Sequence, residues 1–557
     1  MTPRIRGNDY TVLRPPAIGS PWTPRLTVSV VIPAYGAQEK LDLVLAGLSA
    51  QTYPQNLIEV IVVDNGSTPP LRLPEIRPAN TRLVVCPDPG RAAARNAGLA
   101  AATGDVIHWL DADVVPERTE VEAHMRWHHL APYLSVTSYL RFTTAPLPSP
   151  EEVAAAEDLG KFFEPAEPHA WIADLIERTE GLTRSRRPFS VHVGGAASVA
   201  ARLFERAGAM DPEMILGQDT EMGYRLAQAG AVFIPDPEAR GYHLGPSMRM
   251  RDGEAINRVS HALIADRVPV YRWLRSHPYR QWKVPWLEVA VDAAGASFED
   301  VRATVDGVLA GTLTDLAVIL VGPWDEIEPE RRAPLTDPRL DLSLIRAHYA
   351  YEGRVRFATS LPHTAAPFRL HLPPGWVPGE DSLFALLSLA RDEQNLGLVS
   401  VLLAEGPDGI VSARLERTEA FARAAMLVTE GESIDTVVDE TFGTLWVDGE
   451  TYGFVPASAA APLRSARAAY RARVEAEAEV ARLTKETERL RAQVTRWRDE
   501  AAKWRRSAVE YRREIGSLRR QISALKRRDP GLKAIARGIA RSIAFRRSHP
   551  PDKAAGS

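Results

Sequence analysis

The sequence predicts an α/β protein in which two similar α/β domains are followed by a long α-helical coiled coil. Three observations indicate this fold class. Residues 28–63 combine apolar strand-like runs with an amphipathic helix, residues 287–322 repeat that pattern, and residues 480–528 follow a seven-residue period. The chain has 557 residues, 45% hydrophobic and 25% charged, an ordinary globular composition that accommodates about two to four domains.

The first repeat reads VSVVIPAYGAQEKLDLVLAGLSAQTYPQNLIEVIVV: a strand, a helix with leucine and valine on one face, and a second strand. Such a unit normally makes parallel strands in a sheet covered by helices on both faces. Ligands of these sheets bind at the carboxyl ends of the strands. Three polar clusters follow predicted strands and would share that edge: Pro33-Ala34-Tyr35, Asp64-Asn65-Gly66-Ser67 and Asp111-Ala112-Asp113.

The second repeat, LEVAVDAAGASFEDVRATVDGVLAGTLTDLAVILVG, indicates that the chain is duplicated. The position of Asp64 becomes Gly322 in this copy, and His371 and Pro373 stand where the first copy has Asp111 and Asp113. We therefore expect a degenerate sister domain without a divalent metal site, kept for packing, acceptor binding or assembly. The alternative is an unrelated α/β domain that shares only the strand–helix–strand rhythm.

The C-terminal region changes to a composition rich in Ala, Arg and Glu. Apolar residues recur at two heptad positions over more than six heptads, which predicts a coiled coil of about 70 Å and a homo-oligomer, with dimer or trimer left open. These positions are Leu483, Leu490, Trp497, Trp504, Tyr511, Leu518 and Leu525, and Val480, Thr487, Val494, Ala501, Ala508, Ile515 and Ile522.

A basic tail follows Pro530. Residues 519–557 hold eleven Lys or Arg against two Asp, in a chain whose net charge is only −3. The segment GLKAIARGIARSIAFRR predicts a basic amphipathic helix that binds an anionic membrane surface peripherally. The alternative is a solvated terminal helix. The net charge is positive in the tail and negative in the rest of the chain. We therefore do not expect nucleic acid as a partner of the body.

Two further absences narrow the class of protein. Cys86 is the one cysteine, which excludes an intramolecular disulfide framework and a thiolate metal cage, and fits a reducing compartment. The N-terminus lacks the apolar segment of a signal peptide, and no apolar run reaches about 18 residues. We therefore expect a cytoplasmic protein, peripheral on the inner face of the plasma membrane if the tail binds lipid.

Changes of pattern predict the domain boundaries. They are an N-terminal extension (1–26), a first α/β domain (27–282), a second α/β domain (283–457), a linker or helix start (458–479), the coiled coil (480–528) and the basic tail (529–557).

The stretch GDVIHWLDADVVPE carries two aspartates at the end of an apolar run. If strand pairing continued through Asp111, the carboxylates of Asp111 and Asp113 would share a face, an unfavourable arrangement without water, a cation or protonation. The residues alone equally fit a pair of turn and helix-cap aspartates.

Seven stretches together resemble the family 2 glycosyltransferases, which have the GT-A fold and use nucleotide-sugar donors. They occur in the family's order within residues 27–246: VSVVIPAYG, IVVDNGS, GRAAARNAGLAAATGD, HWLDADVVPE, GGAASVAARLFERAG, GQDTEMGYRLAQAG and GYHLG. The resemblance implies that residues 27–282 form a catalytic GT-A domain, and that the sister domain is a degenerate GT-A-like domain.

The resemblance also implies a metal site, because DADV matches the family's Asp-x-Asp motif. Asp113 would bind the cation directly, and Asp111 would contact the donor ribose or a metal-bound water. His243 in GYHLG matches a frequent third ligand, and an imidazole shifts the preference from Mg²⁺ toward Mn²⁺. A hydrogen-bonded histidine at a strand end is the alternative for His243.

By the same resemblance, Asp64 would recognise the nucleotide base, and Pro33 and Tyr35 would wall the base pocket. The family's usual Asp-Asp-Gly-Ser here reads Asp-Asn-Gly-Ser, which keeps the first carboxylate.

Two arginines and two glycines complete the implied donor site. Arg91 and Arg95 are candidates for the diphosphate or base pocket, since a guanidinium suits anionic oxygens; either could instead be a solvated helix charge. Gly194 and Gly195 would let the backbone approach the donor sugar, or would simply form a tight turn.

The catalytic base is implied by the family's Glu-Asp pair at the start of a helix, which here reads Gln218-Asp219. Asp219 would take the proton of the acceptor hydroxyl in a single displacement with inversion. Glu221 is the second candidate, and a helix cap is the structural alternative for Asp219. The change to Gln218 affects acceptor binding more than the identity of the base.

These features predict a metal-dependent inverting glycosyltransferase. It would transfer a sugar to a glycan or lipid-linked acceptor in bacterial cell-surface polysaccharide synthesis. One alternative is a noncatalytic scaffold for other synthesis enzymes, which the complete aspartate set disfavours. The other is a nucleotidyltransferase, which would need a Gly-rich basic loop where the chain has IPAYGAQEK.

Overall fold

The computed structural model describes residues 2–528, except 278, 328–331, 394, 408 and 463–465, together with residues 537 and 539. The chain divides into two compact units, Met1–Ala461 and Pro462–Ser557. The first unit holds two large sheets, and the second is dominated by one helix. The predicted α/β class with a long C-terminal helix is confirmed.

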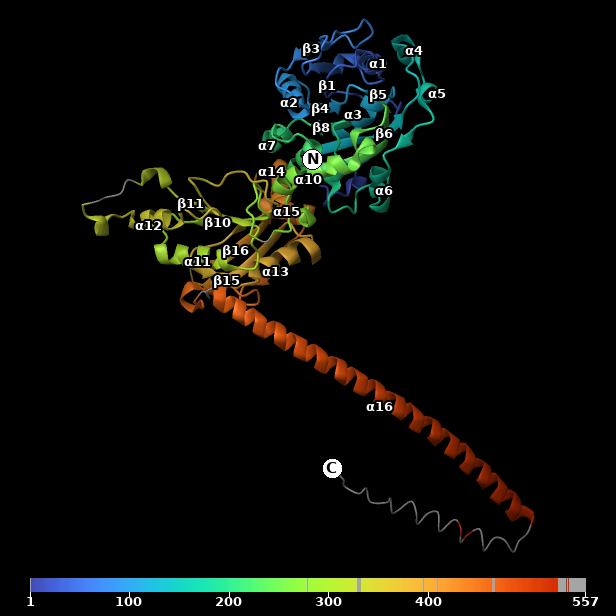
Figure 1. The fold of residues 1–557 in the computed structure, drawn as a ribbon, viewed down its shortest axis with the longest axis vertical. Helices are drawn as coiled ribbons and strands as arrows, with labels where there is room; N and C mark the ends of the chain where they lie inside the picture. The colour runs from blue at the N-terminus through green and yellow to red at the C-terminus, as the bar shows by residue number, and fades with distance from the viewer. Residues whose placement is uncertain are drawn as a thin grey trace. The chain divides into compact units, whose positions relative to one another are not determined.

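Four parallel strands form one half of the first sheet, in the order β3-β2-β1-β4. The register places Ala34 opposite Asp64, so the loops that follow β1 and β2 emerge side by side. Figure 1 shows this half in blue, with helices α1 and α2. The bounds are β1 Val28–Ala34, β2 Ile58–Asp64, β3 Thr81–Val85, β4 Val106–Leu110, α1 Gln38–Ser49 and α2 Arg91–Ala101.

The other half of the sheet continues from β4 in the order β8-β6-β9-β5. Strand β8 is antiparallel to β4 and β6, β9 runs parallel to β6, and β5 is antiparallel to β9. The bounds are β5 Val114–Pro116, β6 Leu134–Thr143, β8 Ala196–Ala200, β9 Val232–Leu244, α3 Glu120–His128 and α8 Gln218–Gln228.

Both faces of this sheet are buried. Consecutive strand residues point to opposite faces, so neighbouring residues of one strand belong to different cores. Val31 of β1 belongs to one apolar cluster, whereas its neighbours Val30 and Ile32 belong to another. Helix α2 lies close to the sheet at Gly98, where a β-carbon would come within 2.2 Å of Cγ1 of Val31. These two cores hold the strand ends, and therefore the polar loops, in fixed positions.

The second sheet repeats the arrangement of the first. Its order β12-β11-β10-β13-β16-β15-β17 matches β3-β2-β1-β4-β8-β6-β9, and each neighbouring pair has the same relative direction. This match supports the predicted duplication. The bounds are β10 Leu287–Asp292, β11 Leu316–Val321, β12 Val355–Ala358, β13 Phe368–His371, β15 Leu398–Gly406, β16 Gly409–Arg417 and β17 Thr444–Asp448.

The first unit consists of two α/β halves, one around each large sheet. The buried side chain of Arg423, in helix α14 (Thr418–Leu427) of the second half, contacts the first half. Its guanidinium donates to the carbonyls of Gly230 at 3.0 Å, Ala231 at 3.2 Å and Ile5 at 3.0 Å. A single cation thus satisfies backbone acceptors after α8 and in the N-terminal extension.

The N-terminal extension is an integral part of the first domain. Ile5 is fully buried in its core, and the side-chain amide of Asn8 bonds both the backbone N–H and the carbonyl of Phe233 in β9. The apolar and polar contacts together make residues 2–26 part of the packing around the sheet.

The second unit contains helix α16, Ala466–Arg528, drawn in orange and red in Figure 1. It is longer than the predicted coiled coil and begins inside the predicted linker. Its heptad side chains are exposed, among them Trp497 at 61% and Trp504 at 75%. Apart from residues 537 and 539, the predicted basic tail lies outside the described residues. Among the residues that are described, no helix has both the length and the apolarity to span a bilayer.

Replacing Arg423 tests the junction between the two halves. Arg423→Met leaves several buried carbonyls without a donor, so we expect the free energy of unfolding to fall by about 3 kcal/mol. Arg178→Met is the control, because Arg178 is 64% exposed and pairs with Asp174 on one helix turn. Urea unfolding monitored by circular dichroism measures both, and equal losses in the two variants would contradict the assigned role of Arg423.

Candidate active site

The two aspartates of the Asp-x-Asp motif lie in a turn between β4 and β5. Strand β4 ends at Leu110, and the backbone N–H of Asp111 donates to the carbonyl of Gly195 at 2.9 Å. The N–H of Val114 then donates back to the carbonyl of Asp111 at 3.1 Å. The strand alternation therefore does not continue through the motif, and the turn itself brings the two carboxylates together.

A group suited to a metal ion forms at this turn. Asp111, Asp113 and His243 each offer a ligand atom, and these atoms lie within 4.8 Å of one another. The pairing of β5 with β9 sets Val114 opposite His243 and so brings the imidazole beside Asp113. Two carboxylates and one imidazole are a donor set that fits Mn²⁺ or Mg²⁺, with the nitrogen favouring Mn²⁺.

The orientation of His243 fits a ligand role. Its Nδ1 lies 2.8 Å from the carbonyl oxygen of Gly245, which can only accept, so Nδ1 carries the proton. In the neutral imidazole the lone pair is then on Nε2, 3.5 Å from Oδ1 of Asp113. A carbonyl behind a histidine is the usual way in which proteins orient a metal-binding imidazole.

Lys40, at the start of α1, is a residue that sequence reasoning missed. Its ammonium lies 3.7 Å from Oδ2 of Asp113 and donates to the carbonyl of Leu244 at 2.6 Å. The lysine therefore offsets part of the negative charge at the turn. In the sequence, nothing distinguishes Lys40 from a solvent-exposed charged residue in the first turn of a helix.

Arg95 connects the metal group to the predicted base. This side chain is buried, and its guanidinium donates to Asp111 at 2.9 Å and to Asp219 at 2.7 Å. The alternative of a solvated helix charge is therefore wrong for Arg95. Burial raises the pKa of Asp111, Arg95 opposes that rise, and the charges of Asp113 and Asp219 add to it.

Gly194 and Gly195 support this bridge. A β-carbon at Gly194 would come within 2.0 Å of Nη2 of Arg95, so the glycine leaves the space that the guanidinium occupies. The carbonyl of Gly195 holds the backbone of Asp111. Gly194 therefore makes space for Arg95, and the backbone of Gly195 holds the Asp-x-Asp turn. The approach of these glycines to a donor sugar stays a prediction.

Asp219 and Glu221 differ in their surroundings although both are near the start of α8. Asp219 accepts from Arg95, and about a third of its side-chain surface is exposed. Glu221 is buried, and its two oxygens accept from Arg225 at 2.6 and 2.7 Å. Of the two predicted bases, Asp219 is the one placed beside the metal group.

His192 is a second residue that the sequence did not single out. The side chain is buried, and its Nε2 has no hydrogen-bond partner among the described residues. Burial lowers its pKa to about 4; the charge of Asp219 opposes this shift and that of Arg95 adds to it. A neutral imidazole therefore lies near the Arg95–Asp219 pair at neutral pH.

Asp64 lies at the end of β2, as predicted, and is buried. Its two oxygens accept the backbone N–H groups of Ser67 at 2.8 Å and Leu71 at 3.0 Å. Burial raises the pKa of Asp64, but the hydrogen bonds from Ser67 and Leu71 outweigh this effect and the net shift is downward. The ionised carboxylate thus organises the loop that follows β2.

The remaining predicted donor residues lie around this edge with exposed side chains. Tyr35 is 75% exposed, and Pro33 is partly exposed at the end of β1. Arg91, the first residue of α2, is exposed, approaches Sδ of Met248 at 3.1 Å, and its charge lowers the pKa of Asp111. These side chains are therefore accessible to solvent at the carboxyl ends of the strands.

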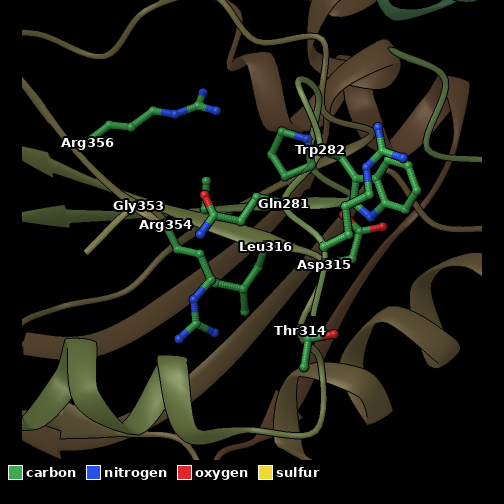
Figure 2. Close-up of a pocket in the computed structure, with 11 residues that line it drawn as sticks. Gln281, Trp282, Thr314, Asp315, Leu316, Gly353, Arg354 and Arg356 are labelled. Carbon is green, nitrogen blue, oxygen red and sulfur yellow. The ribbon is translucent and has the colours of Figure 1, made fainter. Parts of the chain in front are cut away.

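The second sheet holds no comparable metal group among the described residues. His371 lies 3.3 Å from Glu416 instead. Figure 2 shows a pocket in this half, but it includes Thr314 and Leu316 at the amino end of β11, opposite to the edge where such sheets bind ligands. Its Asp315 accepts from Arg275 in a buried ion pair.

Residues 29–144 match the family described as glycosyl transferase family 2. This stretch runs from the second residue of β1 to the end of β6 and includes the Asp-x-Asp turn. The chain carries a family 2 glycosyltransferase domain.

Similar curated proteins include two bacterial polysaccharide synthases. A chondroitin synthase of Escherichia coli is 28% identical over 369 residues, which cover 59% of this chain and 50% of that protein. A hyaluronan synthase of Pasteurella multocida is 28% identical over 324 residues, 53% of this chain and 32% of that protein. The aligned part thus spans half or less of these relatives. A solved mannosyltransferase from Pyrobaculum calidifontis, in complex with GDP-Man and Mn²⁺, has a TM-score of 0.30 and 19% identity, covering 44% of this chain and 68% of that one.

Gly194→Ala tests the Arg95 bridge. The added methyl group displaces the guanidinium from two carboxylates in a buried place, so we expect a loss of about 2 kcal/mol or more in the free energy of unfolding. Gly253→Ala is the matched control, since a β-carbon there meets nothing within 4 Å, and it should change stability by less than about 0.5 kcal/mol. If chemical denaturation gave the same result for both variants, Gly194 would not support the bridge.

Proposed function

We propose that this chain is a metal-dependent, inverting glycosyltransferase that uses a nucleoside-diphosphate sugar and transfers the sugar to a hydroxyl of a glycan or lipid-linked acceptor. One observation carries the proposal: the buried guanidinium of Arg95 links the group of possible metal ligands to the proposed catalytic base. Asp111, Asp113 and His243 form the metal group, and Arg95 ties Asp111 to Asp219.

Asp113 and His243 would hold the divalent cation, with Asp111 contributing to it or to the donor ribose. When bound, such a cation neutralises the charge that develops on the departing diphosphate. Lys40 beside Asp113 and Arg91 at the start of α2 add positive charge along the same edge. Asp64, Pro33 and Tyr35, after β1 and β2, would receive the nucleotide base.

Asp219 would act as the general base. The acceptor oxygen forms a bond to the anomeric carbon on the face opposite the diphosphate, and its proton passes to the carboxylate of Asp219. The electrons of the broken carbon–oxygen bond leave with the diphosphate. Arg95 holds Asp219 at 2.7 Å, so the base has a defined position relative to the metal group.

We assign the chain to bacterial cell-surface polysaccharide synthesis. The names of its relatives in Escherichia coli and Pasteurella multocida support this assignment. The basic tail would bring the enzyme to the anionic inner face of the membrane, where lipid-linked acceptors are found. The second α/β half, whose sheet repeats the first without a metal group, would support packing, acceptor binding or assembly.

The two alternative functions fit the structure less well. A noncatalytic scaffold gives no reason for carboxylates and imidazole to converge at one strand edge and to connect with Asp219. A nucleotidyltransferase would need a Gly-rich basic loop after β1, where the chain instead has Pro33, Tyr35 and the single cation Lys40.

Stepwise substitution of Asp113 and Asp219 tests the proposal. A panel of nucleoside-diphosphate sugars, each with and without Mn²⁺, is screened by thermal shift, and turnover is followed as release of nucleoside diphosphate with glycan acceptors. Asp113→Asn should lose the Mn²⁺-dependent stabilisation. Asp219→Asn should keep it and lose about 10²–10⁴-fold in transfer rate, the usual contribution of a general base.

Glu221→Gln is the matched control, because Glu221 is two residues from Asp219 and is paired with Arg225. It should retain the transfer rate within about tenfold, since its role is in the ion pair. Near-full transfer by Asp219→Asn would exclude Asp219 as base. The absence of stabilisation by any nucleoside diphosphate with metal would contradict the proposed activity as a whole.

Helix α16 is proposed to form a homo-oligomeric coiled coil, because its exposed heptad side chains need a partner helix. Trp497→Glu combined with Trp504→Glu places charges in the seam, and we expect sedimentation velocity to show a monomer. Arg506→Glu combined with Arg513→Glu, at the heptad position farthest from the seam, should leave the oligomer intact. A wild-type monomer at micromolar concentration would exclude the proposed assembly.

A further inference from the structure

A second group of metal-binding side chains is buried between β4, α3 and β6, apart from the Asp-x-Asp turn. It consists of His108, Glu120 and His124, and each of these side chains is only 1% exposed. His108 comes from β4, and the other two are one turn apart in α3. The proposed transfer reaction makes no use of them.

The spacing of the ligand atoms fits a tetrahedral metal ion. Oε1 of Glu120 lies 3.2 Å from Nε2 of His108 and 3.0 Å from Nε2 of His124. With zinc bonds of about 2.0–2.1 Å, the edge of a tetrahedron is about 3.3 Å. The two carboxylate-to-imidazole distances are therefore close to that edge, and all three residues offer ligand atoms within 4.8 Å of one another.

Unsatisfied polar atoms point to a missing ligand in this group. Neither ring nitrogen of His108 has a hydrogen-bond partner among the described residues, and neither has Oε2 of Glu120. Although Nε2 of His108 is 3.2 Å from the carboxylate, the two groups do not align as donor and acceptor. Buried polar atoms without partners destabilise the fold, so a cation bound to Nε2 of His108 would remove part of that cost.

The carboxylate of Glu120 also needs a counter-charge. Arg126, on the same helix, is engaged by Asp236 at 2.8 Å. A buried anion is tolerated when it is paired or binds a metal, and imidazoles such as those of His108 and His124 are common metal ligands.

Hydrogen bonds behind the group would hold its ligands in place. Nδ1 of His124 lies 2.7 Å from Oγ of Ser198, which in turn lies 2.7 Å from Nε2 of His128. Oγ of Ser138 donates to Oε1 of Glu120 at 2.7 Å and is 2.6 Å from Nε2 of His124. Ser138 thus contacts two of the ligands by hydrogen bonds, and Ser198 orients one ligand from behind.

We propose that His108, Glu120 and His124 form a buried structural zinc site. Zinc suits this group because two imidazoles and one carboxylate in an enclosed place match its preferences better than those of Mg²⁺ or Mn²⁺. The ion would fasten β4 to α3 and β6 three residues before Asp111. It would therefore position the Asp-x-Asp turn without contacting the substrate.

Metal content of the full-length protein tests the proposal directly. The protein is produced with added Zn²⁺, freed of loosely bound metal by gel filtration with a weak chelator, and measured by inductively coupled plasma mass spectrometry. We expect close to one zinc per wild-type chain, with an X-ray absorption spectrum that shows two imidazole ligands. Fewer than about 0.1 zinc per chain would overturn the site, and this result does not depend on any variant folding.

Three variants locate the ion. Glu120→Gln should reduce zinc to less than about a tenth of the wild-type content. His129→Gln, at the C-terminal end of α3, and Asp113→Asn, in the other metal group, should both keep one zinc. Zinc that is lost in Asp113→Asn and retained in Glu120→Gln would place the ion at the Asp-x-Asp turn and contradict the proposal.

Discussion

The buried guanidinium of Arg95 is the interaction on which the site depends. It joins a carboxylate of the Asp-x-Asp turn to one at the start of α8, two segments separated by more than 100 residues along the chain. Without this cation, Asp111, Asp113 and Asp219 would be like charges gathered at one edge. With it, the carboxylates stay together before any metal or substrate is bound, so the site is organised in advance.

The topology of the sheet explains how one arginine can reach both aspartates. Strand β4 lies beside β1 and β8, so the turn after β4 meets the Gly194–Gly195 backbone that precedes β8. Helix α2 covers β1 and β2 and directs Arg95 into the gap that Gly194 leaves open. The second sheet has the same strand order, but the strand register puts Gly322 at the position of Asp64, and Pro373 and Gly375 at those of Asp111 and Asp113. The prediction that His371 takes the place of Asp111 is therefore wrong, and the described residues of the second sheet hold no equivalent metal group. The same arrangement of strands therefore occurs in this chain both with and without the side chains of a metal group.

The α/β class and the shared strand edge could be predicted from the sequence, because apolar runs and parallel strands determine which loops are neighbours. The meeting of Asp111, Asp113 and His243 followed only from the resemblance of the motifs to a known family. The sequence did not predict the Arg95 bridge, since a long side chain's direction depends on space created by a distant glycine. The hydrogen bonds from backbone N–H groups to Asp64 could not be predicted either, because they depend on the conformation of the loop after β2. The zinc group combines a strand residue with two helix residues, and no local spacing in the sequence reveals that contact.

Anomalous diffraction at the manganese edge, from crystals grown with Mn²⁺ and a nucleoside diphosphate, tests the central claim most directly. The account predicts one manganese peak within about 2.5 Å of ligand atoms of both Asp113 and His243. It also predicts that Asp219 lies across the sugar-binding space from the diphosphate. A manganese peak away from this turn, or nucleotide bound without any ion at these side chains, would contradict it.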